Sequence, residues 1–188
     1  MCRIGITYFQ KIQTILNHIH RGNIYEVNFC QEFYSNNVDV SPEELFYKLN
    51  KITESPFASF LNIESTSVIC LSPERYLLKD GNHIISQPIK GTEKRAFNKE
   101  EDFKLIKELE QNPKERAENI MIVDLVRNDL SKTALKGSVE VKELCKIYTF
   151  DQVHQMISTV TSKVDVKTHP IDIIKSTFPM GSMTGAPK

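Results

Sequence analysis

Apolar residues recur at helical spacing in the first part of the chain. In 9–20, apolar positions three and four residues apart predict an amphipathic helix, which Gly22 ends. Ser41, Pro42 and Glu44 then provide a side-chain cap, a proline at the first helical position and an acid three residues after the cap. These residues predict that a second helix starts after Ser41.

The helical pattern returns in the second half. Asn98 is a candidate cap for a helix that Pro113 interrupts, and a longer helical pattern covers 114–132. The run Thr168-His169-Pro170 predicts the start of a last helix, which continues to Phe178.

Short apolar or alternating runs predict strands in 25–34, 57–63, 67–71, 75–79, 83–86, 139–141, 147–150 and 156–164. Asp80-Gly81 predicts a tight hairpin turn between two of these strands. Because strands and helices come in blocks and do not alternate strictly, we predict an α+β fold with antiparallel sheets.

Composition narrows the class of protein. The 188 residues are 40% hydrophobic and 26% charged with zero formal net charge, which indicates an ordinary globular chain and argues against a nucleic-acid-binding surface. The apolar runs are too short to span a bilayer, so we expect no membrane partner. The cysteines at 2, 30, 70 and 145 form no Cys-x-x-Cys pair, which favours reduced thiols and the cytoplasm.

Lys90 is the first candidate for chemistry. It lies between Pro88-Ile89 and Gly91-Thr92, in what we predict to be a tight bend, and Glu74 opens the hairpin that carries it. A constrained lysine beside an acid suits a buried amine nucleophile working with a general acid. A solvated lysine at a strand end is the alternative that the local pattern leaves open.

Glu118 is the candidate metal ligand. On a helix it shares one face with Ile122, Leu125 and Asp129, and an acid on an apolar stripe is costly to bury without a cation. Mg²⁺ prefers such oxygen ligands. A surface glutamate in a charged turn is the alternative for Glu118, and we expect Asp129 to be structural.

The segment 178–187 is a candidate anion-binding loop. Gly181 and Gly185 permit a close approach of the backbone to an anion, and Ser182 and Thr184 can add hydroxyl donors. We expect this loop to lead into a helix, whose first N–H groups favour negative charge. A simple turn is the alternative.

Several segments together resemble the chorismate-utilising enzymes, in family order and across nearly the whole chain: 22–29, 72–75, 88–92, 118–125, 127–130 and 178–188. A lysine at the position of Lys90 is similar to the aminodeoxychorismate synthase branch, whereas the anthranilate synthase branch usually has alanine there. The resemblance implies packed antiparallel sheets flanked by helices, in one partial chorismate-binding catalytic domain that occupies 1–188.

The resemblance also implies a reaction, the amination of chorismate to 4-amino-4-deoxychorismate in p-aminobenzoate and folate synthesis. It implies that Lys90 adds at C2 and expels the C4 hydroxyl, after which ammonia enters at C4 and displaces the lysine. Glu74 would be the general acid and His154 a second donor near the leaving hydroxyl. Gly91 and Thr92 would contact the ring, with Mg²⁺ as the cofactor.

The same resemblance implies where the ammonia comes from and which parts of the site lie outside this chain. Ammonia would come from a glutamine amidotransferase subunit, because nothing in the chain resembles a glutaminase nucleophile motif. The family continues past Lys188 with a second metal-binding glutamate and a grip for the pyruvyl carboxylate. We therefore expect 1–188 alone to be incomplete and inactive. Alternatives are anthranilate synthase component I, an isochorismate-forming enzyme, or an inert chorismate-binding fragment.

Glu26 departs from the family pattern. Amine-transferring relatives often carry glutamine at this position, and isochorismate-forming relatives carry a lysine that acts as a base for water. Glu26 adds a negative charge near a dianionic substrate. We expect it either to point outward or to meet a cation.

Overall fold

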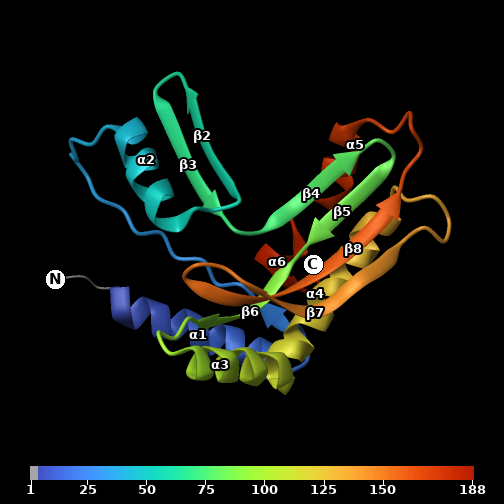
Figure 1. The fold of residues 1–188 in the computed structure, drawn as a ribbon, viewed down its shortest axis with the longest axis horizontal. Helices are drawn as coiled ribbons and strands as arrows, with labels where there is room; N and C mark the ends of the chain where they lie inside the picture. The colour runs from blue at the N-terminus through green and yellow to red at the C-terminus, as the bar shows by residue number, and fades with distance from the viewer. Residues whose placement is uncertain (1–3) are drawn as a thin grey trace.

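The computed structural model describes residues 4–188. Figure 1 shows two arms that rise on either side of a gap above a base of helices. Along the chain the elements are α1 (Ile4–His20), β1 (Glu26–Val27), α2 (Pro42–Thr53), β2 (Phe57–Ile63), β3 (Thr66–Ser72), β4 (Arg75–Asp80), β5 (His83–Gln87), β6 (Ile89–Lys94), α3 (Lys99–Gln111), α4 (Pro113–Ser131), β7 (Glu140–Thr149), β8 (Val153–Lys163), α5 (Pro170–Thr177), α6 (Gly181–Thr184) and β9 (Gly185–Ala186).

Strand β8 is the centre of a five-stranded antiparallel sheet. β7 pairs along one side of it. β5 and β6 share the other side, β5 pairing with the end of β8 and β6 with its start. The chain passes from β5 to β6 at Pro88, whose carbonyl oxygen accepts a hydrogen bond of 3.2 Å from the Ser158 amide. Lys90 therefore follows directly on from the β4–β5 hairpin.

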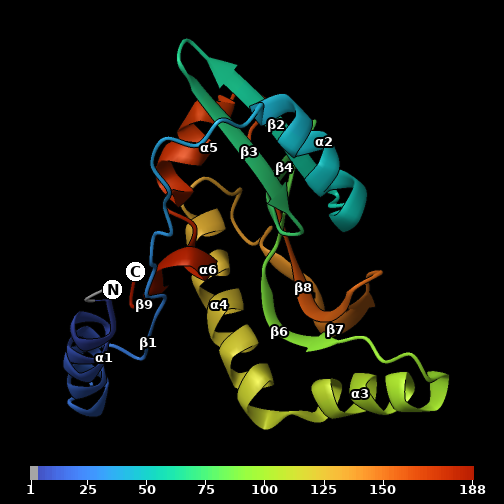
Figure 2. The ribbon, with the colours of Figure 1, turned by 90° about the vertical axis from the view of Figure 1, so that its left-hand side faces the viewer.

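The main core lies between this sheet and the long helix α4, which runs beside it in Figure 2. Its members are buried aliphatic side chains: Ile84, Ile122, Val123, Val126, Leu130, Val160, Val164 and Ile173. Each such side chain stabilises the fold by about 1.5–3 kcal/mol relative to an exposed position. This packing holds α4 against the strands that carry the predicted site.

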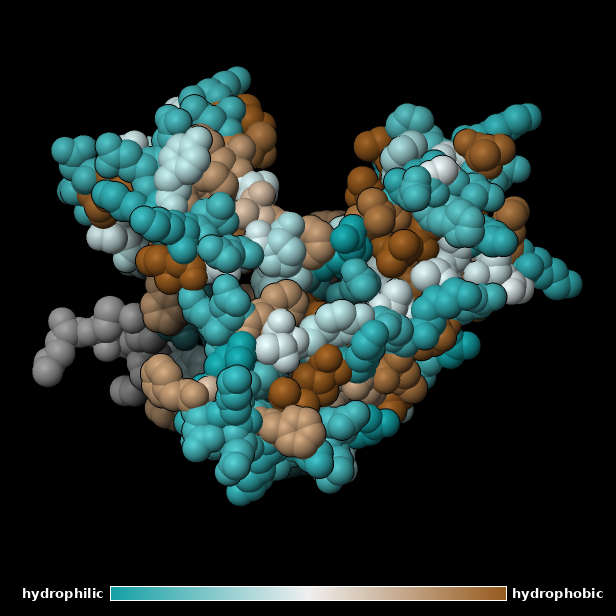
Figure 3. All heavy atoms as spheres, in the orientation of Figure 1, coloured by the Kyte–Doolittle hydropathy of each residue, from teal (hydrophilic) through white to brown (hydrophobic). Residues whose placement is uncertain are grey.

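The second arm consists of the β2–β3 hairpin and α2 (Figure 1). Helix α2 begins as expected, with the Ser41 hydroxyl accepting a hydrogen bond of 3.4 Å from the Glu44 amide. Phe46 of α2 stacks on Phe60 of β2, with ring centroids 5.7 Å apart. Figure 3 shows a hollow between the two arms, and apolar side chains of this hairpin, including Ile63 and Val68, remain exposed.

The predicted α+β class with antiparallel sheets is confirmed, and so are most of the helices and hairpins. The strand expected in 25–34 is wrong beyond its start, because only Glu26–Val27 finds a partner strand. The runs 139–141 and 147–150 belong to one strand, β7, which contains register shifts and a positive φ of 53° at Cys145.

Two loops expected from the sequence are regular structure. Residues 88–92 were predicted to form a tight bend, but Ile89–Lys94 is strand β6, with an irregular register between Ile89 and Thr92. The segment expected as a loop after Phe178 contains α6 and β9.

Two further expectations concern membrane-spanning helices and the cysteines. None of the helices in 4–188 is long and apolar enough to cross a bilayer. Cys30, Cys70 and Cys145 are free thiols, and Cys2 lies outside the described residues.

Candidate active site

An ion pair between β6 and β1 holds the side chain of Lys90. Its Nζ lies 3.1 Å from Glu26 Oε1, and the two side chains are only 17% and 16% exposed. The same ammonium donates a hydrogen bond of 3.1 Å to Asn28 Oδ1. Glu26 and Asn28 stand two residues apart, and both reach the lysine. Lys90 is thus a largely buried amine with defined partners, and the solvated strand end is excluded.

Helix α4 fixes the backbone of Lys90. The buried Asn119 side chain donates hydrogen bonds to the carbonyl oxygens of Lys90 at 3.1 Å and Met156 at 3.0 Å. The next residue, Gly91, has a φ of +97°, and an added Cβ would lie 3.2 Å from Met156 Cβ and 3.3 Å from Glu115 Cβ. The glycine therefore allows β6 to pass tightly between β8 and α4. The ring contacts expected of Gly91 and of Thr92, the following exposed residue, stay predictions.

The C-terminal segment is fastened to the strand that carries Glu26. β1 pairs with β9, Glu26 opposite Ala186 and Val27 opposite Gly185. Gly185 has a φ of +134°, and an added Cβ would lie only 2.3 Å from the Glu26 carbonyl oxygen. The close backbone approach expected of Gly185 is thus made to a neighbouring strand. Asn28 Nδ2 also donates a hydrogen bond of 2.9 Å to the Ser182 carbonyl oxygen.

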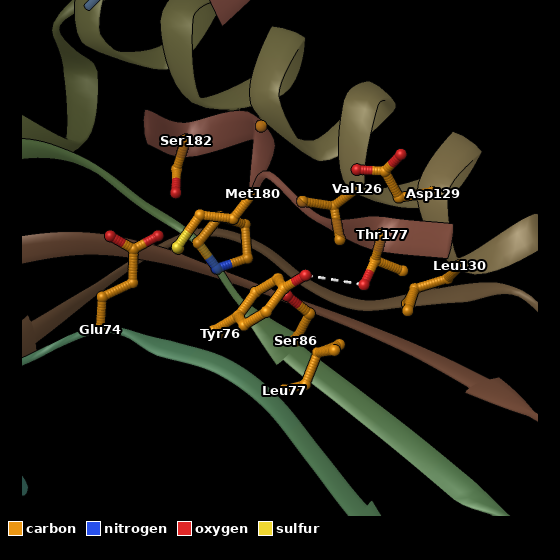
Figure 4. A pocket seen from close by; sticks show the side chains of 12 residues that line it. Glu74, Tyr76, Leu77, Ser86, Val126, Asp129, Leu130, Thr177, Met180 and Ser182 are labelled. Atoms are coloured by element: carbon orange, nitrogen blue, oxygen red, sulfur yellow. Dashed lines mark hydrogen bonds between the residues drawn. The ribbon is translucent and has the colours of Figure 1, made fainter. Parts of the chain in front are cut away.

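Glu74 lies directly before β4, where the chain crosses between the arms. Figure 4 shows its side chain and that of Ser182 pointing toward one another. Within residues 4–188, neither Glu74 Oε1 nor Ser182 Oγ has a hydrogen-bond partner, although both atoms are buried. Burial raises the pKa of the Glu74 carboxyl, and the Ser182 hydroxyl, the Ile89 backbone and the Lys90 charge offset part of this effect. A carboxyl with a raised pKa suits a proton donor near neutral pH.

The cavity beside Glu74 is small. It has a volume of about 10 Å³ and is lined by residues that include Tyr76, Met180 and Ser182 (Figure 4). Such a volume holds about one water molecule. It is too small for a ring-sized ligand.

The other residues expected in the anion-binding loop are used within the fold. An added Cβ on Gly181 would lie 3.1 Å from Leu125 Cβ of α4. The Thr184 hydroxyl donates to the Met180 and Gly181 carbonyl oxygens, each at 3.4 Å. Only Ser182 presents a buried hydroxyl without a partner among the described residues of this loop. The substrate contacts expected of Gly181, Ser182, Thr184 and Gly185 stay predictions.

His154 is completely buried on β8. Its Nε2 lies 2.9 Å from Asp102 Oδ1, and its Nδ1 lies 2.9 Å from Thr149 Oγ1. Asp102 is itself held by Arg95, whose guanidinium is the main cause of the lowered pKa of that carboxyl. Both ring nitrogens are therefore engaged by protein groups, and the proton-donor role expected of His154 stays a prediction.

Glu118 lies in the second turn of α4, 32% exposed, with its Oε1 3.3 Å from Lys114 Nζ. Glu115 Oε1 lies 3.7 Å from the same nitrogen. Two carboxylates thus share one cation close to Gly91, which Glu115 contacts. In 4–188 no three acidic, histidine or cysteine side chains are grouped as a metal site. The oxygen donors nevertheless fit the preference of Mg²⁺ for hard ligands with several waters.

Asp129, on the same helix, has the structural role expected of it. Its carboxylate is buried and is paired with Lys132 at 2.8 Å and with Lys188 at 2.6 Å. Lys188 also donates to the Thr177 carbonyl oxygen at 2.5 Å. These contacts fasten the C-terminal segment to α4.

Sequence reasoning missed two members of the site, Asn28 and Glu115. Of the two alternatives left open for Glu26, the structure shows the one in which it meets a cation, Lys90. Asn28 could have been found from its spacing, because residues two apart on a strand point the same way. Glu115 had no signal beyond its place in the same helix as Glu118.

The chain is similar in sequence and in fold to known proteins. Residues 6–188 match the family described as chorismate binding enzyme. Aminodeoxychorismate synthase component 1 of Escherichia coli (strain K12) is 40% identical over 181 residues, which cover 96% of this chain and 40% of that protein. Anthranilate synthase component 1 of Bacillus pumilus is 38% identical over 181 residues, covering 96% of this chain and 35% of that protein.

A solved structure has a similar fold. Anthranilate synthase component I from Streptococcus pneumoniae TIGR4 superposes with a TM-score of 0.79 at 26% sequence identity, covering 94% of this chain and 38% of that one. The chain thus spans about 40% of the length of the curated relatives that it matches.

Proposed function

The chain belongs to the chorismate binding enzyme family, and from this premise we propose that it carries part of an active site that aminates chorismate to 4-amino-4-deoxychorismate. The observation that carries the proposal is the largely buried Lys90, paired with Glu26 and close enough to Glu74 for its charge to act on that carboxyl. Relatives named aminodeoxychorismate synthase component 1 support the same reaction.

The chemistry follows from the charge states of two side chains. Lys90 first loses the proton of its ion pair with Glu26 to solvent. The resulting amine adds to C2 of the ring, and the double bonds shift as the C4 hydroxyl departs. Glu74 gives its proton to that hydroxyl, so that water leaves and not hydroxide. The raised pKa of Glu74 keeps the proton available near neutral pH. Ammonia then bonds to C4 and displaces Lys90.

Mg²⁺ is the proposed cofactor, with Glu118 as its ligand and Glu115 as the nearest additional carboxylate. When bound, the ion supplies positive charge that can hold a substrate carboxylate. Lys114 pairs with both acids, so its side chain would have to turn away for the two carboxylates to hold a metal.

The proposed source of the nitrogen rests on the names of the relatives. A glutamine amidotransferase subunit would deliver ammonia, and the product would serve p-aminobenzoate and folate synthesis. We place the reaction in the cytoplasm, which the free thiols Cys30, Cys70 and Cys145 support.

The test is product analysis. The complete protein that carries this chain is incubated with chorismate, Mg²⁺ and ammonium, and the products are separated by chromatography. A lyase that converts aminodeoxychorismate to p-aminobenzoate is added in a second reaction. Formation of p-aminobenzoate only in the presence of the lyase supports the proposal.

Anthranilate formation is the second candidate, because relatives and a solved structure with that name match the chain well. The same chromatogram separates the two, since anthranilate would appear without the lyase. Anthranilate as the main product would replace the proposed reaction.

A further inference from the structure

The two carboxylate oxygens of Glu26 lie in different surroundings. Oε1 is 3.1 Å from Lys90 Nζ. Oε2 is buried, and within residues 4–188 no hydrogen-bond donor reaches it. A buried carboxylate oxygen without a donor is unfavourable, so its presence points to a ligand that brings one.

The backbone that carries this carboxylate is held by neighbouring segments. The backbone of Glu26 is paired with Ala186, and the neighbouring Gly185 backbone lies against the Glu26 carbonyl oxygen. Asn28 holds Lys90 on one side and the Ser182 carbonyl oxygen on the other. Glu26 therefore starts from a fixed backbone position, and its side chain is held at Oε1 by Lys90.

The chemistry of the free oxygen selects the ligand. Oε2 is an acceptor with negative charge, so a substrate carboxylate would be repelled from it. Ammonium has only N–H donors and a positive charge, and it is the acid form of the nucleophile that the proposed reaction consumes. Charge-assisted hydrogen bonds of this kind are among the stronger ones in proteins.

We propose that Glu26 binds the incoming ammonium through Oε2 and relays its proton to Lys90 through Oε1. This inference rests on the proposed amination. One carboxylate then serves two amines, the one that arrives and the one that leaves.

Before ammonium reacts, the Lys90 adduct returns its extra proton to the Glu74 carboxylate, so the adduct nitrogen is a neutral secondary amine. Ammonium gives one proton to Oε2 and becomes ammonia. The ammonia nitrogen forms a bond to C4, both ring double bonds shift, and the bond between C2 and the Lys90 nitrogen breaks. The electron pair of that bond stays on Lys90, which takes the proton from Glu26. Glu26 is again a carboxylate, Lys90 a neutral amine, and the product carries an ammonium group.

A merely structural Glu26 is the competing explanation. In that case the side chain only positions Lys90, and its loss would disturb the addition of Lys90 to the ring. In a relay, its loss would spare this addition and impair the step that uses ammonium. The two steps can be observed separately, because without ammonium the reaction stops at the Lys90 adduct.

The test uses the complete protein and the variants Glu26→Gln, Glu26→Asp and Glu108→Gln. Glu108 is the matched control, an exposed glutamate paired with Lys104 at 3.5 Å on α3. Intact-protein mass spectrometry measures the adduct formed with chorismate and Mg²⁺ alone. Steady-state assays with varied ammonium and varied chorismate then measure the two KM values and kcat.

For Glu26→Gln we expect the adduct to form as in the wild type. The KM for ammonium should rise by about ten- to a hundredfold, as for the loss of a charged hydrogen-bond partner, while the KM for chorismate changes little. Glu26→Asp should recover part of the ammonium step, and it also reports on the carboxylate if the glutamine variant fails to fold. Glu108→Gln should match the wild type.

An unchanged KM for ammonium in Glu26→Gln would overturn the relay, and so would loss of the adduct with ammonium kinetics otherwise intact. A wild-type protein that forms neither adduct nor aminodeoxychorismate would overturn the proposed function, and the relay with it. A wild type that aminates chorismate while Glu26→Gln does so equally well would overturn only the relay.

Discussion

Glu26 Oε1 lies 3.1 Å from Lys90 Nζ, in an ion pair between two side chains that are each less than one-fifth exposed. This contact accounts for the negative charge that Glu26 adds to a site expected to hold a dianionic substrate, because the charge is compensated by the lysine. It also joins a two-residue strand near the N-terminus to the strand that follows the β4–β5 hairpin.

Removal of the Lys90 amine should abolish amination. In the complete protein, we expect Lys90→Ala to lower turnover by orders of magnitude at saturating ammonium, because the amine that forms the adduct is removed. Lys94→Ala, on the exposed end of the same strand, is the matched control and should keep normal turnover. Near wild-type amination by Lys90→Ala would rule out the covalent role.

Glu118→Gln should weaken Mg²⁺ binding, because the amide carries no charge for the metal. Isothermal calorimetry with Mg²⁺ in the absence of substrate measures this directly, and we expect the affinity to fall by about tenfold or more. Asp124→Asn on the same helix is the control, since Asp124 is 66% exposed and paired with Arg127. If both variants bind Mg²⁺ like the wild type, the metal site lies elsewhere.

The raised pKa of Glu74 predicts how stability depends on pH. Burial favours the protonated form in the folded protein, so the folded state holds the proton at a pH where the unfolded chain has already released it. The contribution of Glu74 to stability is thus complete below its ordinary pKa and is lost as pH rises through the folded value.

Glu74→Gln should remove this dependence. Urea unfolding of both proteins from about pH 4 to about pH 8 should show the variant gaining stability relative to the wild type as pH rises. Glu108→Gln, a change at an exposed glutamate, should show no such trend. A constant difference between Glu74→Gln and the wild type over this range would contradict the buried, protonated carboxyl.

Gly185→Ala should disrupt the contact between β9 and β1. A residue with a side chain is strained by about 1–3 kcal/mol in the backbone conformation of Gly185, and the new Cβ would overlap the Glu26 carbonyl oxygen at 2.3 Å. We expect a loss of stability in denaturant unfolding and, because Glu26 shifts, faster modification of Lys90 by an amine reagent.

Gly137→Ala is the matched control for this strain. Gly137 also has a positive φ, of +73°, but nothing lies within 4 Å of its added Cβ. Gly137→Ala should lower the free energy of unfolding by about 1–2 kcal/mol through backbone strain alone, with the reactivity of Lys90 unchanged. Equal effects of the two substitutions would show that the β1–β9 contact does not position Glu26.

The sequence by itself determined the elements that depend on near neighbours. Helix α2 starts where Ser41, Pro42 and Glu44 predict it, because a cap is satisfied by groups within one turn. The hairpin turn at Asp80-Gly81 likewise connects strands that are adjacent in the chain. The spacing of apolar residues also located α4 and, with it, the position of Glu118 on a helix.

The tertiary structure alone decided which distant segments meet. Residues 28–34 have the alternating pattern of a strand but form none, and β1 exists only where β9 supplies two residues. The sequence predicts a bend at Lys90, but its segment pairs with β8 and is a strand. Its partners Glu26 and Asn28 come from β1 and the segment after it, and Asn119 from α4. A strand's hydrogen bonds and a buried charge both need partners from outside their own segment, and local sequence carries no information on which distant segment provides them.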